Sequence, residues 1–331
     1  MIQSDVLNEA DLDLVAALQV APRASVAVLA DALGMSSSTV GRRLARLEEQ
    51  RILRVIGQVE WAARAEGNPR HVWVTTRPGS VGEVAHALAQ LPEAQLVAET
   101  SGRSDVYLAV HDTDRARARE LLTERIPSVP GVAGTHSELV LRALTRADSW
   151  RLHRLDDTQV ATLSQAEDAV TPSDSPGGSK VGEDERRVIA LLQQDGRITA
   201  AEAGRVLGLS QSTTYRLIQS ILRRGLVRPR VEVEPALLGY GLEVIIALTI
   251  SPGAIQAVAE ELARHPSARY VSIVAGTTSV IHQGVFRNED EMADFLTRDL
   301  APLPGISALQ VSVVLRMLRR YWIHREDGRF A

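Results

Sequence analysis

The sequence LGMSSSTVGRRLARL, residues 33–47, is matched later in the chain by LGLSQSTTYRLIQSI, residues 207–221. Both segments begin with Leu-Gly, have a serine two positions after the glycine, and share Ser-Thr and an arginine at corresponding positions. The chain aligns with itself without a gap at this offset of 174 residues, so that Gly102 falls on Gly276 and Pro130 on Pro304. Solenoid repeats run to about 20–50 residues. Residues 7–144 and 181–318 are therefore two copies of one longer, multi-domain unit.

The residues around the first segment have the pattern of three helices. Asn8 or Asp11 is suited to begin the first helix, and residues 26–33 are predicted to form a second that ends at Gly34, because glycine accepts the positive φ of a tight turn. Ser36 can cap the third helix through its side-chain oxygen. The apolar residues of this helix recur at i, i+4 and i+7, which leaves its arginines on other faces. The pattern predicts a helix-turn-helix.

Both helical segments are basic, although the whole chain has a net charge of −4. Residues 23–54 contain six arginines and three acidic residues, and residues 197–230 contain seven arginines and one acidic residue. A solvated helix face is the simpler explanation of a charge run, but the glycine, the serine cap and the apolar spacing all agree with a DNA-binding helix. We therefore expect double-stranded DNA as a partner.

If the third helix enters the major groove, its N-terminal residues face base edges and the arginines farther along mostly contact phosphates. The predicted DNA-binding residues of the first copy are Ser36, Ser37, Ser38, Thr39, Arg42, Arg43, Arg46 and Arg54. Those of the second copy are Ser210, Gln211, Ser212, Thr213, Tyr215, Arg216, Arg223 and Arg224. The phosphate candidates among them are Arg43, Arg46, Arg223 and Arg224. Because Ser37 becomes Gln211 and Gly41 becomes Tyr215, we expect the two copies to prefer different half-sites.

The residues after each basic segment alternate as in β-strands. In the first copy, helices are predicted at 81–91 and 114–126, and strands at 53–59, 70–76, 96–100, 106–111 and 132–141. From residue 70 onward the order is β-α-β-β-α-β, which is typical of a ferredoxin-like domain with two helices on one face of a four-stranded antiparallel sheet. The other face is expected to meet a partner, since an exposed apolar sheet is a liability.

The chain resembles, twice over, the Lrp/AsnC or feast/famine family of transcriptional regulators. The resemblance rests on Leu18-Gln19, on the LGMS…RRLARL segment and on TSGRSDVY at residues 100–107. It implies an α+β protein in which a winged-type helix-turn-helix domain precedes a ferredoxin-like, RAM-type effector domain. The expected domains are helix-turn-helix domains at 1–54 and 181–230, effector domains at 55–150 and 231–331, and a linker at 151–180. The duplication is a departure, because typical members carry one copy and pair through their sheets.

The resemblance also implies that an amino acid or related small metabolite binds near the Gly-x-x-Asp turn where two effector domains meet. The residues assigned in this way are Thr100, Ser101, Gly102, Asp105, Gly276 and Ser279. Ser279 stands where the first copy has Asp105, so the ammonium group of an amino acid would lose a charged partner there. A plain hairpin turn, with Asp105 as a capping carboxylate, is the alternative for these residues.

The segment between the copies, residues 156–183, contains many Ser, Pro, Gly and Asp residues and is predicted to be a flexible linker. A coil of about 28 residues spans roughly 30 Å, which lets the two effector domains of one chain pair with each other. We expect this intrachain pseudo-dimer to associate further into homo-oligomers. The final residues 319–325, RRYWIHR, are expected to pack on the sheet, with a DNA or interface contact as the alternative.

Composition limits the other classes of function. The absence of cysteine excludes disulfides and thiolate chemistry and fits a reducing cytoplasm. No run of about 18 apolar residues predicts a membrane span, and the first residues, MIQSDVLNEADLD, lack the apolar core of a signal peptide. We therefore expect a soluble, cytoplasmic protein without a membrane partner.

A catalytic function is the main alternative, because sirohaem-type tetrapyrrole decarboxylases resemble this family and are sometimes fused in tandem. The candidates here are Arg70, His71 and Trp73, but no histidine matches them around Leu242, Glu243 and residues 244–246 of the second copy. The histidines lack metal-site spacing, and we expect no catalytic residues, metal or cofactor. A ligand-independent architectural DNA-binding protein is the other alternative.

Overall fold

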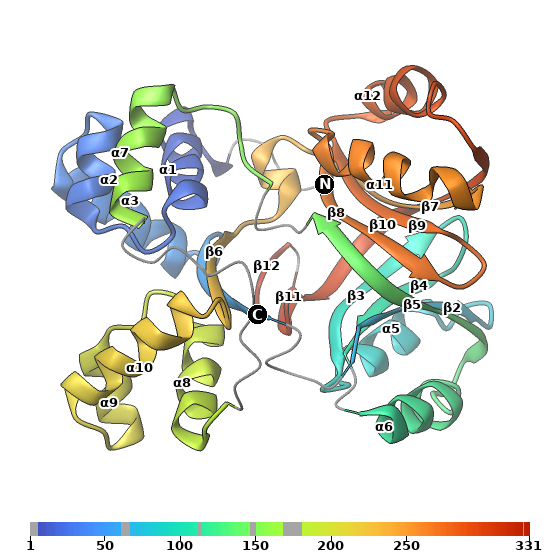
Figure 1. Cartoon of the computed structure of the whole chain (residues 1–331), viewed down its shortest axis with the longest axis horizontal. Coiled ribbons are helices and arrows are strands. Elements are labelled where there is room, and N and C mark those ends of the chain that lie inside the picture. The colour runs from blue at the N-terminus through green and yellow to red at the C-terminus, as the bar shows by residue number, and fades with distance from the viewer. Residues whose placement is uncertain (1–5, 61–66, 112–113, 146–149, 168–180, 327) are drawn as a thin grey trace. The chain divides into compact units, whose positions relative to one another are not determined.

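The computed structural model describes residues 6–60, 67–111, 114–145, 150–167, 181–326 and 328–331. By its contacts the chain divides into two units, each built from both copies of the repeat (Figure 1). One unit, formed within residues 5–64 and 151–233, contains the two helix-turn-helix segments, called here the first and second heads. The other unit, formed within residues 65–150 and 234–331, contains the two effector copies.

Each head consists of three helices and one strand. The first head is formed by α1 (Glu9–Val20), α2 (Val26–Leu33), α3 (Ser37–Glu49) and β1 (Arg54–Val59). The second head is formed by α8 (Glu183–Gln194), α9 (Ala200–Leu207), α10 (Gln211–Arg223) and β6 (Val227–Glu232). N-cap side chains begin these helices except α8, whose N-cap is Gly182; Asn8, for example, accepts from the backbone N–H of Asp11 at 3.1 Å.

The strand that follows each head joins it to the other head. β1 pairs antiparallel with β6, so that Arg54 lies opposite Glu232 and Val59 opposite Val227. Val59 is buried in the core of the second head, among residues of its helices. The two heads therefore share a two-stranded ribbon and part of a core.

The segment for which a flexible linker is predicted contains a helix, α7 (Asp157–Glu167), which packs against α1 and α2 of the first head. Asp156 begins it by accepting from the backbone N–H of Gln159 at 2.8 Å, and Leu163 is fully buried. The structure differs here from the expectation because a side-chain cap and one buried leucine outweigh the polar composition of the segment as a whole. The Ser- and Pro-rich part, residues 168–180, lies outside the described residues.

Each effector copy has the predicted β-α-β-β-α-β order. The elements of the first copy are β2 (Arg70–Thr76), α5 (Val81–Ala89), β3 (Ala94–Ser101), β4 (Val106–Val110), α6 (Arg115–Glu120) and β5 (Val132–Thr145). Those of the second are β7 (Leu242–Ile250), α11 (Ile255–Arg264), β8 (Ala268–Ala275), β9 (Val280–Phe286), α12 (Glu289–Asp294) and β10 (Ile306–Arg320). A π-helical turn extends α6 through Leu121–Arg125 and α12 through Phe295–Leu300.

The two effector sheets close into one ring of strands. Within the copies the strand orders are β3-β4-β2-β5 and β8-β9-β7-β10, and the copies are joined where β5 pairs with β8 and β10 pairs with β3. Each long last strand also carries a leucine into the core of the other copy: Leu318 of β10 lies in the first core, and Leu144 of β5 packs against the second. The effector copies therefore form the expected intrachain pair through both edges of each sheet.

The C-terminal residues extend the ring by two short strands, β11 (Ile323–Glu326) and β12 (Arg329–Phe330). Arg319 is buried and donates to the backbone oxygens of Ala89 and Leu91 at the end of α5, at 2.8 and 2.6 Å. Arg320 is buried as well and donates to both carboxylate oxygens of Glu243 at 2.7 and 2.6 Å. These tail arginines are used inside the effector unit.

Candidate functional site

The turn between the second and third helices is built alike in the two heads. Gly34 and Gly208 end α2 and α9 with φ of 63° and 71°, a conformation that glycine adopts without strain. Ser36 and Ser210 then cap α3 and α10, accepting from backbone N–H groups at 3.2 and 3.1 Å. The first turn of each third helix is thereby fixed to a rigid corner.

The polar residues at the start of the third helices divide into two groups. Thr39 and Thr213 are half-buried, and their hydroxyls lie 2.8 Å from the capping serine oxygens, so they belong to the cap. The side chains that remain exposed on this first turn are Ser37, Ser38, Gln211 and Ser212. Of these, Ser38 and Ser212 also contact the capping serines, at 3.0 and 3.1 Å.

The predicted base-reading arginines lie on the exposed face of the third helices. Arg42 and Arg216 are exposed, and Arg216 donates to the backbone oxygen of Ser212 at 3.3 Å. Tyr215 is 57% exposed on the same face. At the corresponding Gly41, an added Cβ would meet only Val26 Cγ1 at 3.8 Å, so this position has room for a side chain.

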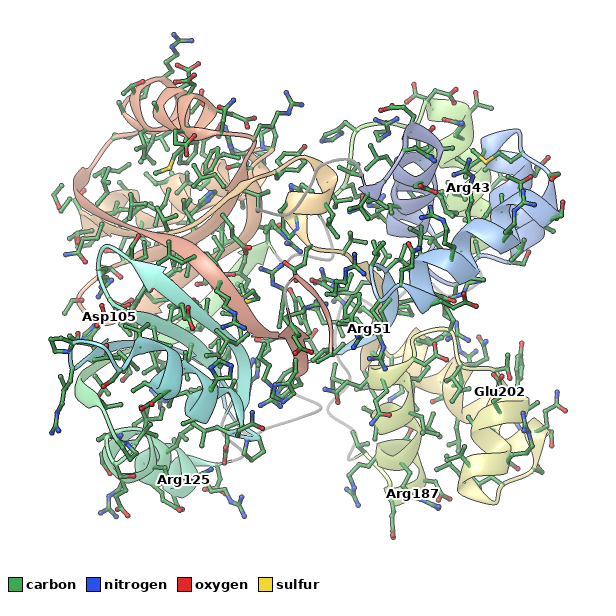
Figure 2. All side chains as sticks on the ribbon, turned by 180° about the vertical axis from the view of Figure 1, so that it is seen from behind. Arg43, Arg51, Asp105, Arg125, Arg187 and Glu202 are labelled. Atoms are coloured by element: carbon green, nitrogen blue, oxygen red, sulfur yellow. The ribbon has the colours of Figure 1, made fainter. Side chains whose placement is uncertain are left out.

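Three of the predicted phosphate contacts are engaged inside their own head. Arg43 and Arg46 pair with the buried carboxylate of Asp11 at 2.8 and 2.7 Å (Arg43 is labelled in Figure 2). In the second head, Arg224 pairs with Glu185, the counterpart of Asp11. The arginines tie the third helix to the first, a role that the sequence interpretation missed because the acidic partner lies more than thirty residues away in the chain.

Two more of the arginines predicted to bind DNA lie elsewhere on the heads, the phosphate candidate Arg223 and Arg54. Arg223 is exposed and donates to the backbone oxygen of Gln219 at 3.3 Å. Arg54, at the start of β1, donates to the backbone oxygen of Gln194 in the second head at 3.0 Å. Arg223 is therefore placed at the surface, whereas Arg54 is part of the contact between the heads.

A reciprocal pair of arginines holds the heads together. Arg197 donates to the backbone oxygens of Pro22 and Ala24 at 2.8 Å each, and Arg23 donates to those of Gly196 and Ile198. The two arginines, and the carbonyl groups that they bind, occupy equivalent positions of the repeat. The heads thus contact each other with approximate twofold symmetry, as an isologous dimer does.

The two turns assigned to an effector lie where the effector copies meet. Gly102 has φ of 106°, and a Cβ there would lie 2.2 Å from the backbone oxygen of Val311 on β10. A Cβ on Gly276 would lie 2.5 Å from Cγ of Glu138 on β5. Ser101 is exposed, and the buried Thr100 donates through its hydroxyl to the Ser104 backbone oxygen at 2.8 Å. Each turn therefore faces the last strand of the other copy.

Asp105 and Ser279 perform the same local task. The Asp105 carboxylate accepts from the backbone N–H and the hydroxyl of Thr76 at 2.7 and 3.1 Å (Asp105 is labelled in Figure 2). Ser279 accepts from the backbone N–H of Ile250 at 3.1 Å and donates to its backbone oxygen at 3.2 Å. Because Ile250 is the counterpart of Thr76, both side chains hold the end of the first strand of their copy. This geometry agrees with the capping alternative.

Of the residues considered for catalysis, His71 and Trp73 are buried, whereas Arg70 is half-buried. His71 is fully buried, and its two ring nitrogens contact the Tyr107 hydroxyl and, at 3.2 Å, Ser272 Oγ of the other copy. Burial lowers the pKa of His71 to about 4. Gln283 Nε2 donates to the same Tyr107 oxygen at 2.9 Å. The neutral histidine is therefore one member of a hydrogen-bond network that joins the two copies.

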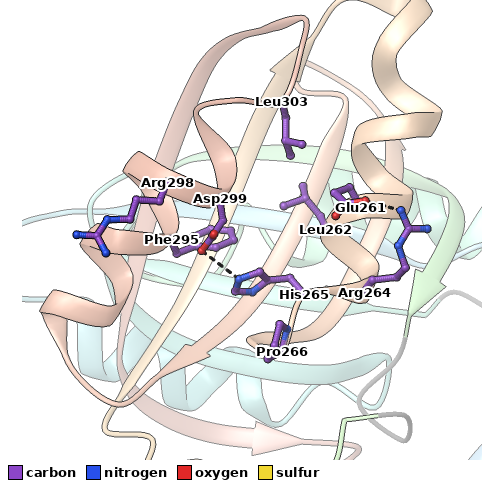
Figure 3. Close-up of a pocket in the computed structure, with 9 residues that line it drawn as sticks. All are labelled: Glu261, Leu262, Arg264, His265, Pro266, Phe295, Arg298, Asp299 and Leu303. Carbon is purple, nitrogen blue, oxygen red and sulfur yellow. Dashed lines mark hydrogen bonds and ion pairs between the residues drawn. The ribbon is translucent and has the colours of Figure 1, made fainter.

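A pocket of about 360 Å³ lies in the second effector copy (Figure 3). His265 and Asp299 line it and approach each other to 3.3 Å, beside Phe295. It contains none of the predicted DNA-binding or effector residues. No group of His, Cys, Asp and Glu within the described ranges is placed to hold a metal ion. Among the helices described, none is long and apolar enough to cross a membrane.

Two protein families match the chain, and each matches it twice. The Lrp/AsnC ligand binding domain matches residues 71–150 and 243–321. The AsnC-type helix-turn-helix domain matches residues 7–48 and 184–219. Together these matches cover more than half of the chain, and they follow the repeat seen in the sequence.

Similar proteins correspond in length to one copy. An uncharacterised HTH-type transcriptional regulator of Pyrococcus abyssi is 28% identical over 136 residues, which are 41% of this chain and 86% of that protein. HTH-type transcriptional regulator FL11 of Pyrococcus horikoshii is 25% identical over 133 residues, 40% of this chain and 87% of that protein. This chain therefore contains twice, in one polypeptide, the unit that such relatives contain once.

A solved structure of similar length shares the architecture of the whole chain. The siroheme decarboxylase NirDL, in complex with an iron-uroporphyrin III analogue, aligns with a TM-score of 0.59 over 95% of this chain and 93% of its own. The identity is 15%, so this likeness concerns the fold alone. Function has to be argued from the sites.

Proposed function

Because the chain belongs to the Lrp/AsnC family, we propose that it is a sequence-specific DNA-binding transcriptional regulator that carries both of its reading heads in one polypeptide. The observation that carries this proposal is the pair of capped third helices, whose first turns and whose Arg42 and Arg216 are exposed. The β1–β6 ribbon and the reciprocal arginines Arg23 and Arg197 hold these helices in one unit. The proposed DNA-binding domains, expected at 1–54 and 181–230, are continued by the β1–β6 ribbon, and the proposed effector domains, expected at 55–150 and 231–331, begin after it.

The exposed side chains are proposed to make different kinds of contact with DNA. Ser37 and Ser38 in the first head, and Gln211 and Ser212 in the second, are placed to face base edges if the third helices enter the major groove. Arg42, Arg216 and Arg223 supply base or phosphate contacts, which makes the affinity fall with salt. Arg43, Arg46 and Arg224 act indirectly, because they position the third helix through Asp11 and Glu185.

A titration of DNA with Arg42→Ala and Arg216→Ala variants tests this proposal. Each substitution should weaken binding to an operator fragment by about 1–3 kcal/mol if the arginine reads a base. The DNA upstream of the coding region and a scrambled duplex serve as probes, at several salt concentrations. Arg115→Ala, which removes an exposed arginine of α6, is the matched control. Unchanged affinity in both head variants would exclude these helices as the readers.

The two heads are proposed to prefer different half-sites, since Tyr215 replaces Gly41. Gly41→Tyr, at a position where an added Cβ meets only Val26 Cγ1 at an ordinary 3.8 Å, should move the preference of the first head toward that of the second. Selection of binding sites from a random duplex pool by the wild type and by Gly41→Tyr measures this change. Identical selected sites for both proteins would contradict the assignment of Tyr215 as a specificity residue.

We further propose that an amino acid or a related small metabolite binds the effector unit and changes the affinity of the heads for DNA. The matched ligand binding domain and the position of both turns between the copies support this. Such coupling requires the ligand to bind the two states of the protein with different affinity. Repeating the DNA titration with pools of amino acids tests it. Association of chains into homo-oligomers, also proposed, is measured by sedimentation with and without the pools.

A tetrapyrrole decarboxylase is the second candidate, favoured by the likeness in fold over 95% of the chain. The two candidates predict different spectra when iron-uroporphyrin III is added to the protein. A regulator should give the sum of the separate absorption spectra. A saturable shift of the porphyrin bands, together with no DNA binding at low salt, would favour the enzyme.

A further inference from the structure

The side chain of Glu138 crosses from the first effector copy into the turn of the second. Glu138 lies on β5 and is fully buried. Its Oε1 accepts from the backbone N–H and the hydroxyl of Thr278 at 3.2 and 2.9 Å, and from the Thr277 hydroxyl at 3.0 Å. Arg103 donates to the same oxygen at 3.2 Å, and His136 Nε2 lies 3.4 Å from it. One buried carboxylate thus collects donors from both copies.

The turn is shaped around this carboxylate. A Cβ at Gly276 would overlap Cγ of Glu138 at 2.5 Å, so the glycine leaves the space that the glutamate fills. The Arg103 guanidinium, which pairs with the carboxylate, also lies 4.4 Å from the ring centre of Trp73 and is thereby held in place. A backbone N–H, two hydroxyls and a guanidinium are the donors with which proteins bind carboxylate ligands.

The equivalent turn of the first copy has no such carboxylate. Ser312 occupies the position of Glu138; it is fully buried, and within the part of the chain that the structure describes its hydroxyl has no hydrogen-bond partner. Ser104, the counterpart of Thr278, turns its hydroxyl to the backbone oxygen of Val106 at 3.3 Å. The hydroxyl at this position is therefore directed across the interface only where a carboxylate is present.

The surroundings of Glu138 favour its ionised form. Burial by itself would raise the pKa of this carboxyl, but the hydrogen bonds from Thr278, Arg103 and Thr277 and the charge of Arg103 outweigh burial and lower the pKa. The anion is therefore the form that the second turn holds.

We propose that the turn at residues 276–279 is a carboxylate-binding site that the chain fills with its own Glu138. The side chain acts as a built-in ligand, and it joins the two effector copies at one of their two equivalent contacts. A small carboxylate such as formate or acetate can take its place only when the glutamate is removed. If the effector function proposed above holds, an external effector then acts through the turn of the first copy alone.

Replacement of the missing carboxylate by a small anion tests the proposal. Glu138→Ala should lower the melting temperature of the full chain by about 10 °C, since it leaves buried donors and a guanidinium unpaired. Sodium formate or acetate should then raise the melting temperature of this variant to a saturating value. Sodium chloride at the same ionic strength should not, and the wild type should respond equally to all three salts. Equal effects of formate, acetate and chloride on Glu138→Ala would overturn the proposal.

A double-mutant cycle covers the case in which Glu138→Ala does not fold. Glu138→Gln keeps the shape and removes the charge, and Thr278→Val removes a donor. The melting-temperature losses of the two variants should be clearly less than additive in the double variant. Ser312→Ala and Ser104→Ala, at the equivalent positions, should be additive. Additive losses at the first pair would also overturn the proposal. All these readouts are independent of DNA, so failure of the regulator function leaves them interpretable.

Discussion

The inner faces of the two effector sheets differ in the size of their side chains. Strand alternation directs Val72 and Val74 to the helix-covered core, and His71 and Trp73 to the inside of the ring. Three buried residues of the first copy are large and aromatic where the second has smaller aliphatic ones. The equivalent pairs are His71 and Ile245, Trp73 and Ala247, and Tyr107 and Ile281.

This difference shows what fusion of two copies allows. In a homodimer every contact between residue i of one subunit and residue j of the other occurs twice, so a side chain cannot be enlarged on one side alone. In a fused chain, one copy can carry large side chains on its inner face while the other copy carries smaller ones that leave room for them. The bonds of Tyr107 and His71 to Gln283 and Ser272 follow the same logic, because donors and acceptors come from different copies. The pairing of the two copies is thereby specified within the chain.

The largest effect is expected when the size difference is removed. Trp73→Ala should lower the free energy of unfolding by about 3–5 kcal/mol, because it leaves a cavity inside the ring. Ala247→Trp, which gives both copies the same residue, should cost about 1–3 kcal/mol through overpacking. Urea denaturation of the full chain measures both values. Full stability of Ala247→Trp would show that the inner face has spare volume and that the copies are not complementary.

The second comparison concerns the response to acid, because each effector copy buries a histidine with a strongly lowered pKa where the other copy has an aliphatic residue. Burial lowers the pKa of His71 from 6.5 to about 4 and that of His282 from 6.5 to about 3. The unfolded chain therefore takes up protons below pH 6.5 that the folded chain does not. Stability should fall with decreasing pH from about 6.5 toward these values, by roughly 2 kcal/mol per histidine at pH 5.

Replacing each histidine by the residue at the same position of the other copy tests whether these histidines cause the loss of stability in acid. His71→Ile and His282→Leu copy Ile245 and Leu108, and each should reduce the difference in unfolding free energy between pH 7 and pH 5. Ile245→Val, which changes the inner face of the second copy without adding or removing a titratable group, should leave that difference as it is in the wild type. If His71→Ile and His282→Leu both keep the full acid loss, other groups cause it.

The heads differ less. The carboxylate between the first and third helices pairs with two arginines in the first head, where it is Asp11, and with one in the second head, where it is Glu185. Burial would raise the pKa of Asp11, but hydrogen bonds from the Asn8 backbone and from Arg43 and Arg46, with the charge of Arg46, lower it. The stability that Asp11 contributes is thus present above its unfolded pKa and lost as the pH falls through the lowered one.

Asp11→Asn should cost about 1–2 kcal/mol at pH 7, a value reduced because both arginines are partly exposed. Glu185→Gln should cost about 1 kcal/mol or less, since it removes one ion pair, with Arg224, where Asp11→Asn removes two. Urea denaturation measures both. A larger loss for Glu185→Gln than for Asp11→Asn would reverse the order that the ion pairs imply.

Much of this architecture follows from local sequence signals. The repeat, the glycine at each helix turn, the serine caps and the strand alternation predict the heads and the β-α-β-β-α-β order, because each depends on residues close together in the chain. The pairing of β5 with β8 and of β10 with β3 is a contact between copies, for which local pattern gives no register. From the sequence, a pairing of the two effector copies could be expected, but neither the strands that pair nor the closure of the sheets into a ring.

The roles of individual charged residues were harder to predict for the same reason. Arg43 and Arg46 have the spacing of a surface arginine run, and only the packing of α3 on α1 shows that Asp11 binds them. Glu138 has no distinguishing motif, and its donors come from a segment about 140 residues away. A usable signal existed for Arg23 and Arg197, which are arginines at the same position in both copies. A residue kept in both halves of a duplicated chain is a candidate for their symmetric contact.

The smallest effect is expected at the position where the two copies use different residues for the same structural role. Asp105 and Ser279 both hold the end of the first strand, the former through Thr76 and the latter through Ile250. Asp105→Ser should therefore cost about 1 kcal/mol or less, because serine still accepts from the Thr76 N–H, whereas Asp105→Ala loses the bond and should cost more. If Asp105 serves only the strand, the response of DNA binding to an amino-acid pool should be the same in Asp105→Ser as in the wild type. Loss of that response with stability intact would instead show that the Asp105 carboxylate contacts the ligand. It would also explain why the second copy, whose turn is filled by Glu138, can carry Ser279 instead of an aspartate.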